Sequence, residues 1–301
     1  MSIEECLQND FKVIDMTNIM MIKDYLKLQE YEESNHNLVN MILWMKWYPL
    51  FYYLDANYLL LLGVHKNEMF IYMPLCKDEY FNEAILKAKS IFDGYGLPFV
   101  MSCFVEKQKD MVKELLKDVS ISEDPGSFDY IYDNERLKDF KGKKLQKKRN
   151  HLNAFYKEYD GRWQYERIDK YNVGECEKFL DNWAKDKKED FLLAEVEGAK
   201  RILGLVDKLD YRGGLIRIDN EIKAFAIGSH LSKRMWQENV EKADDSYRGL
   251  YQAMLQQLII HEFADYELVN REDDLDLENL RHAKMAYAPL YLIHKYKIRK
   301  V

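Results

Sequence analysis

The segment with the clearest chemical capacity runs from residue 236 to residue 252, where a predicted strand passes through a polar loop into a helical pattern. It reads WQENVEKADDSYRGLYQ. Backbone N–H groups and the positive dipole end at the start of a helix can hold a phosphate or a carboxylate. Arg248 would add charge there, and Gly249 would let a ligand approach the backbone closely. The alternative is a helix that is simply capped by Asp245 or Ser246.

A second segment concentrates positive charge in a chain whose formal net charge is −7. Residues 138–149 contain seven Lys or Arg and one Asp. As a helix over residues 143–159, the segment has one apolar face and a cationic front end. The polar residues of that end are Lys143, Lys144, Lys147, Lys148, Arg149 and Asn150. They form either a solvated face of a linker helix or a local site for phosphates.

A third segment is acidic, because residues 265–278 hold seven acids and a single Arg. The helical pattern that follows places Arg281, Lys284 and Tyr287 three residues apart. The simplest explanation is helix capping with surface ion pairs, each of which stabilises little.

Several common catalytic signatures are absent from the sequence. There is no GxGxxG after a strand, no GxxxxGK[ST] and no GxSxG, which leaves dinucleotide, P-loop and α/β-hydrolase functions without support. The segment His261-Glu-Phe-Ala-Asp265 lacks the second His of a zinc-protease motif. We expect no metal site, since zinc needs three or four convergent ligands.

Helical and strand patterns alternate along the whole chain. In the first half they predict helices within 17–46, a hairpin over 58–74 with its turn near Lys66-Asn67, helices over 79–92 and 107–117, and strands over 99–105 and 128–132. In the second half they predict helices over 174–187, 249–263 and 277–286, a hairpin over 215–228 turning at Asp219-Asn220, and strands over 235–240, 266–270 and 290–296. The two halves are alike in element order.

Length and composition indicate a compact protein of two domains. The chain has 301 residues, which is longer than a typical domain with a single hydrophobic core. Hydrophobic residues make up 47% of it, as expected of a globular protein. We place the domains at 1–137 and 161–301, joined by a basic inter-domain helix at 138–160. The N-terminus lacks an apolar signal region, and the four cysteines form no CxxC pair. These features predict a cytoplasmic protein with no integral membrane contact.

Four ordered motifs within residues 125–296 resemble those of a widespread family. They are Asp129-Tyr-Ile-Tyr132; Gly142-Lys-Lys with Lys148-Arg-Asn150 and Phe155; Glu241-Lys-Ala-Asp244 with Gly249 and Gln252; and Asn270-Arg-Glu-Asp-Asp-Leu275 with Leu280-Arg281, Ala283-Lys284 and Tyr287-Ala-Pro289. The chain thus resembles a domain-of-unknown-function family related to the C-terminal catalytic domain of phosphatidylglycerol lysyltransferase. It departs from the family pattern at Asp276 and Asn279, where the family favours Gly.

The resemblance implies an α/β (α+β) fold of two tandem GNAT-like N-acyltransferase domains, with mixed sheets flanked by helices. It also implies transfer of an acyl or aminoacyl group to an amine or hydroxyl. On this interpretation Glu241, with Glu238 as the less favoured choice, is the candidate base, and Tyr287 with Lys284 is the candidate acid or oxyanion partner. Asp244, Arg248 and Gly249 would shape the donor loop. The other family-motif residues are Asn270, Arg271, Glu272, Asp273 and Arg281.

The donor would be a co-substrate, aminoacyl-tRNA or acyl-CoA, and no tightly bound cofactor is expected. The basic helix favours tRNA, because several cations suit the phosphates of an RNA backbone, whereas the loop at 244–249 favours coenzyme A. Candidate acceptors are a small molecule, a peptide or a lipid headgroup. The chain lacks the membrane segments of lipid-modifying enzymes, so a lipid is not implied. The alternative is a non-catalytic protein of this fold that binds nucleic acid or a small anion.

Overall fold

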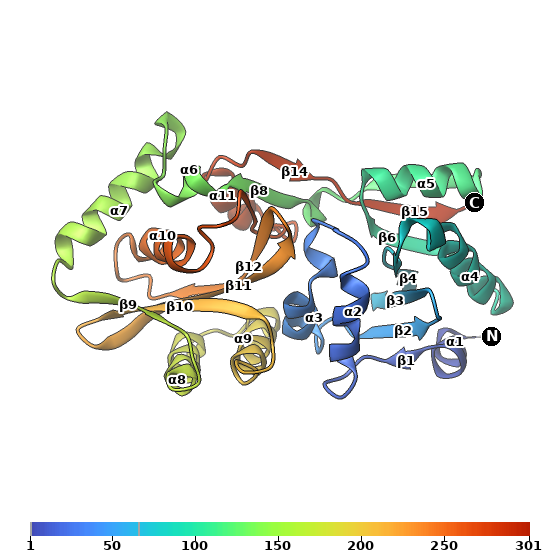
Figure 1. The fold of residues 1–301 in the computed structure, drawn as a ribbon, viewed down its shortest axis with the longest axis horizontal. Helices are drawn as coiled ribbons and strands as arrows, with labels where there is room; N and C mark the ends of the chain where they lie inside the picture. Colours follow the sequence, from blue (N-terminus) through green and yellow to red (C-terminus); the bar gives the residue numbers. More distant parts are fainter. Residues whose placement is uncertain (1, 66) are drawn as a thin grey trace. The chain divides into compact units, whose positions relative to one another are not determined.

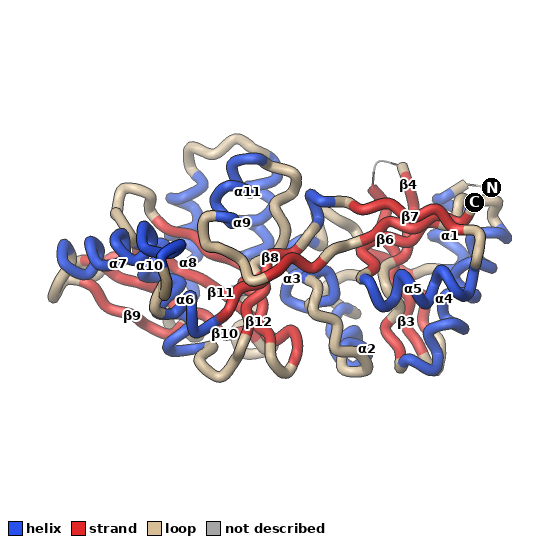
Figure 2. The backbone as a smooth tube through the Cα atoms, turned by 90° about the horizontal axis from the view of Figure 1, so that it is seen from above, coloured by secondary structure: helices blue, strands red, loops and turns tan. Residues whose placement is uncertain are grey.

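The chain forms two compact units in a computed structural model that describes residues 2–65 and 67–301. Unit 1 comprises Met1–Phe128 and Ile293–Val301, and unit 2 comprises Asp129–Leu292. Each unit is built on one mixed sheet flanked by helices (Figures 1 and 2). The predicted α/β class with two mixed sheets is therefore confirmed.

The sheet of unit 1 has the strand order β1-β2-β3-β4-β6-β15-β7, with β5 paired to β3. Its strands are β1 (Lys12–Val13), β2 (Leu50–Leu54), β3 (Tyr58–His65), β4 (Glu68–Ile71), β5 (Leu75–Cys76), β6 (Val100–Phe104), β7 (Val119–Glu123) and β15 (Tyr296–Lys300). Its α-helices are α1 (Ile3–Asp10), α2 (Ile22–Leu26), α3 (Leu38–Trp44), α4 (Phe81–Gly94) and α5 (Glu106–Leu116). Short 3-10 helices occupy Ile19–Met21, Ser34–His36, Asp78–Tyr80 and Pro125–Ser127. The predicted hairpin is confirmed as β3 and β4, while Lys66 of its turn lies outside the described residues.

The sheet of unit 2 has the strand order β14-β8-β13-β12-β11-β10-β9. Its strands are β8 (Asp129–Asp133), β9 (Trp163–Arg167), β10 (Tyr211–Ile218), β11 (Glu221–Ser232), β12 (Met235–Ala243), β13 (Leu268–Asn270) and β14 (Tyr291–Ile293). Its helices are α6 (Asn134–Lys138), a 3-10 helix at Lys143–Leu145, α7 (Gln146–Glu158), α8 (Val173–Ala184), α9 (Asp190–Leu203), α10 (Leu250–Glu262) and α11 (Glu278–Met285). Helices α7 and α10 lie on one side of the sheet and α8 and α9 on the other (Figure 1).

The hairpin predicted at 215–228 is confirmed, and its turn has the expected chemistry. Strands β10 and β11 pair antiparallel up to Ile218 opposite Glu221. Asp219 and Asn220 between them both have positive φ, 52° and 68°. Two left-handed residues define the tight turn that matches the twist of paired strands, and Asp and Asn tolerate that backbone.

The observed units differ from the predicted domain boundaries. The first unit ends at Phe128, and the basic segment 138–160 belongs wholly to unit 2. The last strand, β15, returns to unit 1 because it pairs with both β6 and β7. The predicted strand at 290–296 is correspondingly two strands, β14 and β15, one in each sheet.

A buried polar group fastens this returning segment within unit 1. The ammonium of Lys295 donates to Ser34 Oγ (3.0 Å) and Asn35 Oδ1 (2.8 Å). Burial raises the pKa of the nearby Glu33 carboxyl, but His36 and Lys295 together hold that pKa below its usual range. Charged groups this deeply buried are stable only when paired, so the network selects where the chain end docks.

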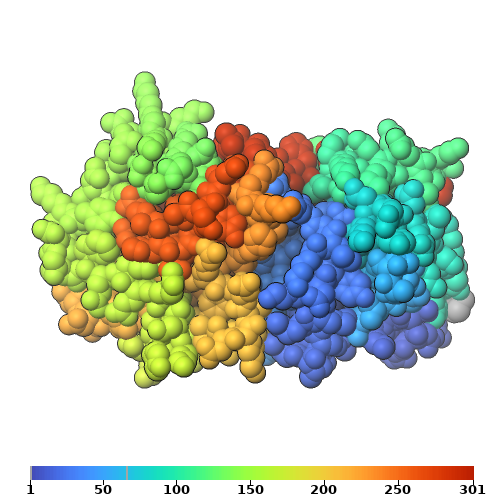
Figure 3. All heavy atoms as spheres, in the orientation of Figure 1, coloured from blue at the N-terminus to red at the C-terminus, as the bar shows by residue number. Residues whose placement is uncertain are grey.

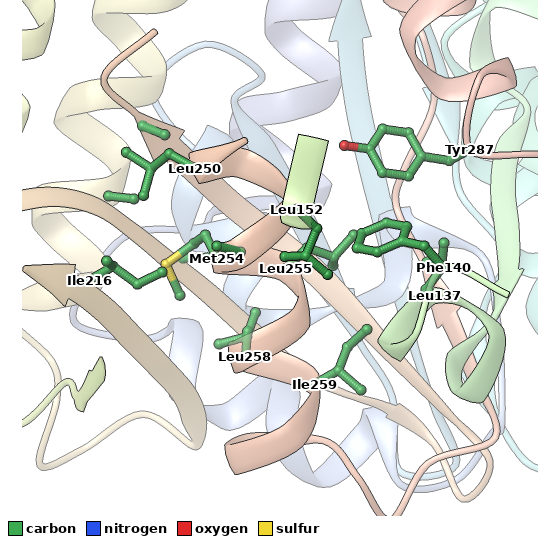
Figure 4. Packing of buried hydrophobic residues seen from close by; sticks show 14 of the residues in the cluster. Leu137, Phe140, Leu152, Ile216, Leu250, Met254, Leu255, Leu258, Ile259 and Tyr287 are labelled. Carbon is green, nitrogen blue, oxygen red and sulfur yellow. The ribbon is translucent and has the colours of Figure 1, made fainter. Parts of the chain in front are cut away.

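Helix α10 is the centre of the hydrophobic core of unit 2 (Figure 4). It is buried on most sides because it packs against the sheet through Met254 and Leu258 and against α6 and α7 on its outer side. A helix that is apolar almost all round must be buried in this way. The predicted apolar face of the 143–159 segment meets α10 through Leu152 and Phe155.

Gly249, just before α10, permits the contact with α7. Its φ is +82°, and a Cβ added to it would lie 2.1 Å from the carbonyl oxygen of His151 and 3.1 Å from Phe155 Cβ. We expected the missing side chain to admit a ligand, but α7 fills that space. The physical reason for glycine here is helix packing together with a left-handed backbone.

We expect Gly249→Ala to lower the free energy of unfolding by about 2–4 kcal/mol, because it adds a clash with the backbone to the cost of positive φ. Urea unfolding would measure this loss. Gly174→Ala is the matched control: Gly174 lies in α8 with nothing within 4 Å of its added Cβ, so stability should be unchanged or higher by about 0.5–1 kcal/mol. Equal stability of both variants would contradict the packing argument.

Candidate functional site

The two parallel strands at the middle of unit 2 pair over only part of their length. Strand β12 pairs with β13 from Met235 to Gln237, and β13 ends at Asn270. Strand β12 continues alongside β11 as far as Ala243. From Glu238 onward, β12 therefore has no ladder partner on the β13 side, and the chain after β13 supplies side chains there instead.

A bulge in β12 turns two carboxylates to the same face. Val240 lies opposite Ile227 while Glu238 lies opposite Gly228, which leaves Asn239 as the extra residue. Residues three apart on a regular strand point to opposite faces, and one inserted residue reverses that relation. Glu238 and Glu241 consequently reach the same partner.

That partner is Arg271, the first residue after β13. Its Nε donates to Glu238 Oε2, and its Nη2 donates to Glu241 Oε2 over 2.9 Å. Its guanidinium carbon also lies 4.7 Å from the ring centre of Tyr287. Burial alone would lower the pKa of Arg271, but the two carboxylates raise it well above its usual range. The guanidinium is a permanent positive charge between two acids and an aromatic ring.

Each of the two carboxylates has one oxygen that accepts no hydrogen bond from the described residues. Oε1 of Glu238 and Oε1 of Glu241 are buried and have no hydrogen-bond partner among the described residues. Burial, followed by the adjacent Glu238 carboxylate, raises the pKa of Glu241 to about 8 in spite of Arg271. Glu241 therefore exchanges a proton close to neutral pH, as a general base must.

Tyr287 closes the other side of this cluster. Its hydroxyl oxygen accepts a hydrogen bond from Gln252 Nε2 at 2.8 Å, and the ammonium of Lys148 lies 4.0 Å from its ring centre. Burial raises the pKa of Tyr287 to about 12, so the phenol keeps its proton at neutral pH. We call Glu238, Glu241, Arg271 and Tyr287 the Arg271 cluster.

The two segments proposed for the donor meet at one surface beside the Arg271 cluster. Gly249 lies against the carbonyl group of His151, and the charges of Arg248, Lys147 and Lys148 all act on the His151 ring. Burial, and then the charges of Arg248, Lys148 and Lys147, lower the pKa of His151. The basic helix and the start of α10 lie side by side, as the neighbouring light-green and orange segments of Figure 3 show, and their cations around His151 are called the cationic area.

The remaining basic residues separate into exposed and structural ones. Lys143, Lys144 and Asn150 are exposed on the front of the segment. Arg149 turns inward, where its Nη1 donates to the carbonyl oxygens of Phe140 (2.6 Å) and Gly142 (3.4 Å). It holds its own loop in place, so we no longer count it among the donor contacts.

Lys284 also has a structural position rather than the catalytic one that we expected. Its ammonium donates to the carbonyl oxygens of Arg271 (2.6 Å) and Asp273. Burial lowers its pKa. Lys284 thus supports the backbone that carries Arg271.

The other motif residues form the turn that aims Arg271. Asn270 donates to Asp129 Oδ2 (3.0 Å) and accepts from the N–H of Glu272 (2.7 Å). Arg281 binds both carboxylate oxygens of Asp274.

One residue of this turn explains the departure from the family pattern. Asp276, where the family favours Gly, has a φ of +57°. Glycine adopts that backbone freely, and Asp is among the few other residues that tolerate it.

Asp244 shapes the donor loop from inside. Its Oδ1 accepts hydrogen bonds from the N–H (3.0 Å) and Oγ (2.6 Å) of Ser246. The carboxylate is therefore engaged in the turn. It also lines a separate groove of about 680 Å³ between α8 and the β10–β11 hairpin, which includes Trp183 and Lys187.

The structure offers no metal centre within the described residues, where no three His, Cys, Asp or Glu side chains come together at ligand spacing. His261, from the segment examined as a zinc motif, interacts with Gln257 (3.1 Å), and its ring stacks on Tyr165 at 4.4 Å. In the described ranges, 2–65 and 67–301, no helix is both long and apolar enough to span a bilayer.

Sequence reasoning missed two parts of this site. It treated Glu238 and Glu241 as alternatives, since odd spacing on a strand gave no reason to join them. It also left Gln252 without a role. The only available signal for this pair was the three-residue spacing of Glu238 and Glu241. That spacing predicts a shared face only if the strand is known to contain a bulge.

Comparison with known proteins identifies relatives. The family described as "Phosphatidylglycerol lysyltransferase, C-terminal" matches residues 27–299. An uncharacterized protein of Mycoplasmoides gallisepticum, MYCGA3080, is 26% identical over 176 residues, covering 58% of this chain and 57% of that protein. The alignment therefore spans little more than half of that relative's length.

Solved structures share the fold. A conserved protein of unknown function from Bacteroides thetaiotaomicron aligns with a TM-score of 0.85 and 25% identity, over 97% of this chain and 99% of that one. The structure of L-PGS from Bacillus licheniformis aligns with a TM-score of 0.67 and 13% identity, over 93% and 91% of the two chains. The resemblance seen in the sequence is confirmed by the family match, and the predicted α/β class with two mixed sheets flanked by helices is confirmed by the structure.

The raised pKa of Glu241 predicts a pH-dependent stability. Because its folded-state pKa of about 8 exceeds the ordinary 4.5, the stabilisation from its bound proton is complete below about pH 4.5 and is lost as pH rises through about 8. Glu241→Gln cannot titrate, so this variant should gain stability relative to the unmodified protein between about pH 5 and pH 9. Urea unfolding at several pH values would measure the difference.

Glu278→Gln serves as the control for that series, since its side chain is 88% exposed. Its stability curve should run parallel to that of the unmodified protein. A parallel curve for Glu241→Gln would contradict the buried, proton-holding state of Glu241.

Proposed function

The chain belongs to the phosphatidylglycerol lysyltransferase C-terminal family, and on this premise we propose that it transfers an aminoacyl or acyl group from a large anionic donor to an amine or hydroxyl. The observation that carries the proposal is the Arg271 cluster, where two carboxylates, a guanidinium and a phenol meet beside the diverging strands. Acyl transfer needs a base for the nucleophile and a donor for the developing oxyanion, and this cluster holds both.

Glu241 is the proposed general base. A nucleophilic amine must lose a proton as it attacks, and a carboxyl with a pKa of about 8 is a stronger base than an ordinary carboxylate once it is deprotonated, so activity should rise as the pH approaches 8. The unused Oε1 atoms of Glu238 and Glu241 are acceptors that an N–H group of a substrate would satisfy. An O–H group would satisfy these acceptors equally, so the cluster fits an amine or a hydroxyl.

Tyr287 and Arg271 are proposed to stabilise the charge that develops on the carbonyl oxygen. A neutral phenol donates one hydrogen bond, and a buried guanidinium contributes a fixed positive charge in a region of low dielectric. Both side chains are held before any substrate arrives, Tyr287 by Gln252 and Arg271 by its two carboxylates. Such preorganisation avoids rearrangement during the reaction.

The cationic area next to the cluster is proposed to hold the donor. Lys147, Lys148, His151 and Arg248 gather where α7 meets the start of α10. We favour aminoacyl-tRNA over acyl-CoA, because the cations continue along the exposed segment to Lys143 and Lys144, farther than one pyrophosphate requires. The acceptor would be a small molecule, a peptide or a lipid headgroup.

We expect Glu241→Gln to lower kcat by roughly 10²- to 10⁴-fold, because it removes the proton acceptor while keeping the shape of the side chain. Tyr287→Phe should also reduce kcat. The assay would present charged tRNA or acyl-CoA with a panel of amines and hydroxyl compounds. Glu278→Gln and Tyr156→Phe are the controls and should retain activity. Unchanged turnover in both cluster variants would remove their assigned roles.

Binding measurements should separate the two donors. The double variant Lys147→Gln/Arg248→Gln should bind both tRNA and acyl-CoA more weakly. The double variant Lys143→Gln/Lys144→Gln should bind tRNA more weakly but acyl-CoA as tightly as the unmodified protein does. For tRNA, the slope of log K against log salt should become shallower by roughly 0.7–0.9 for each phosphate contact removed. Binding of both donors without any transfer would instead favour a binding protein of the same fold.

A further inference from the structure

The hydrogen bond between α10 and Tyr287 constrains the direction of the phenolic proton. Gln252 Nε2 donates to the Tyr287 oxygen over 2.8 Å. An amide nitrogen cannot accept a hydrogen bond, so the proton of Tyr287 has to be directed somewhere other than Gln252. The hydroxyl is thereby an acceptor toward α10 and a donor on its remaining side.

The charged groups around the Tyr287 ring limit further the directions in which the phenolic proton can be donated. Lys148 of α7 and Arg271 after β13 lie 4.0 and 4.7 Å from its ring centre. Neither cation can accept a hydrogen bond. The acidic groups that act on Tyr287 are Glu241 and Glu238 of β12, which both raise the pKa of its hydroxyl. Hydrogen-bond acceptors in this cluster therefore lie toward β12, where Oε1 of Glu238 and Oε1 of Glu241 have no hydrogen-bond partner among the described residues.

The position of Gln252 is itself well determined. It lies in the first turn of α10, a helix buried on most of its sides. The helix start is held against α7 by the contact between Gly249 and His151. A side chain on so rigid an element can set the geometry of a neighbour within a narrow range.

We propose that Gln252 is a positioning residue that aims the hydroxyl proton of Tyr287 toward the carbonyl group being transferred. The nucleophile bonds to the carbonyl carbon and loses its proton to the deprotonated Glu241, while the carbonyl oxygen takes this hydrogen bond. The bond from that carbon to the ester oxygen or thioester sulfur of the donor then breaks, and the proton passes from Glu241 to this leaving group. Without Gln252, no donor would fix the orientation of the hydroxyl, and the phenolic proton could rotate away from the substrate. The inference rests on the proposed acyl transfer, but the orientation of Tyr287 exists without substrate.

Two substitutions test the direction of this hydrogen bond. Gln252→Met removes the donor at similar volume, and Gln252→Glu replaces it with an acceptor that would take the phenolic proton. Both should lower kcat about as much as Tyr287→Phe, with KM changed less than twofold. Combining Gln252→Met with Tyr287→Phe should give no further loss, because the two residues act through one hydroxyl.

Gln257→Met is the matched control. Gln257 lies on the same helix and donates to Tyr156 over the same 2.8 Å, with no atom in the Arg271 cluster. It should preserve kcat, whatever its effect on stability.

A second readout does not require activity. In protein labelled at tyrosine ¹³Cζ, the Tyr287 resonance, assigned with Tyr287→Phe, should shift at neutral pH in both Gln252 variants and not in Gln257→Met. An unchanged resonance, or full kcat in Gln252→Met, would overturn the inference. If the unmodified protein transferred nothing while the resonance shifted as expected, the proposed function would fail and the orientation of Tyr287 would stand.

Discussion

Unit 2 depends on one buried arginine held between two carboxylates. Three charges taken out of water are unfavourable unless each is paired with good geometry, and Arg271 meets Glu238 and Glu241 through separate nitrogens. Burial, together with the neighbouring Glu238 carboxylate, raises the pKa of Glu241 to about 8, so Glu241 retains a proton near neutral pH. Stability and reactivity therefore arise from the same three side chains.

Much of the surrounding structure serves to place that arginine. The turn after β13 is fastened by Asn270 and Lys284, which bind Asp129 and two backbone carbonyls respectively. The bulge at Asn239 supplies the two acids from one strand. The family-motif residues thus divide into a small set that forms the Arg271 cluster and a larger set that holds the backbone around it, as is usual for sites that must be held accurately.

The contact between α7 and the start of α10 has a comparable role for the cationic area. It requires a glycine because two backbones approach there, and it joins segments a hundred residues apart in sequence. A donor bound at this surface would meet charges from both segments at once. The basic segment is consequently a structural part of unit 2, with an apolar face in the core and cations beside the Arg271 cluster.

The sequence alone determined the alternation of helices and strands, the hairpin at Asp219-Asn220 and the family, because local turn chemistry, periodicity and motif order are written in neighbouring residues. It did not reveal helix α9 or the return of β15 to the first sheet. Tertiary structure alone decided that Glu238 and Glu241 share a face, that Lys284 and Arg149 bind backbone carbonyls, and that Gly249 accommodates α7. The contact of Gly249 with α7 depends on a partner distant in the chain, and the shared face of Glu238 and Glu241 depends on a single inserted strand residue. The bonds of Arg149 and Lys284 depend on how the nearby loops fold back, which residue spacing alone does not predict.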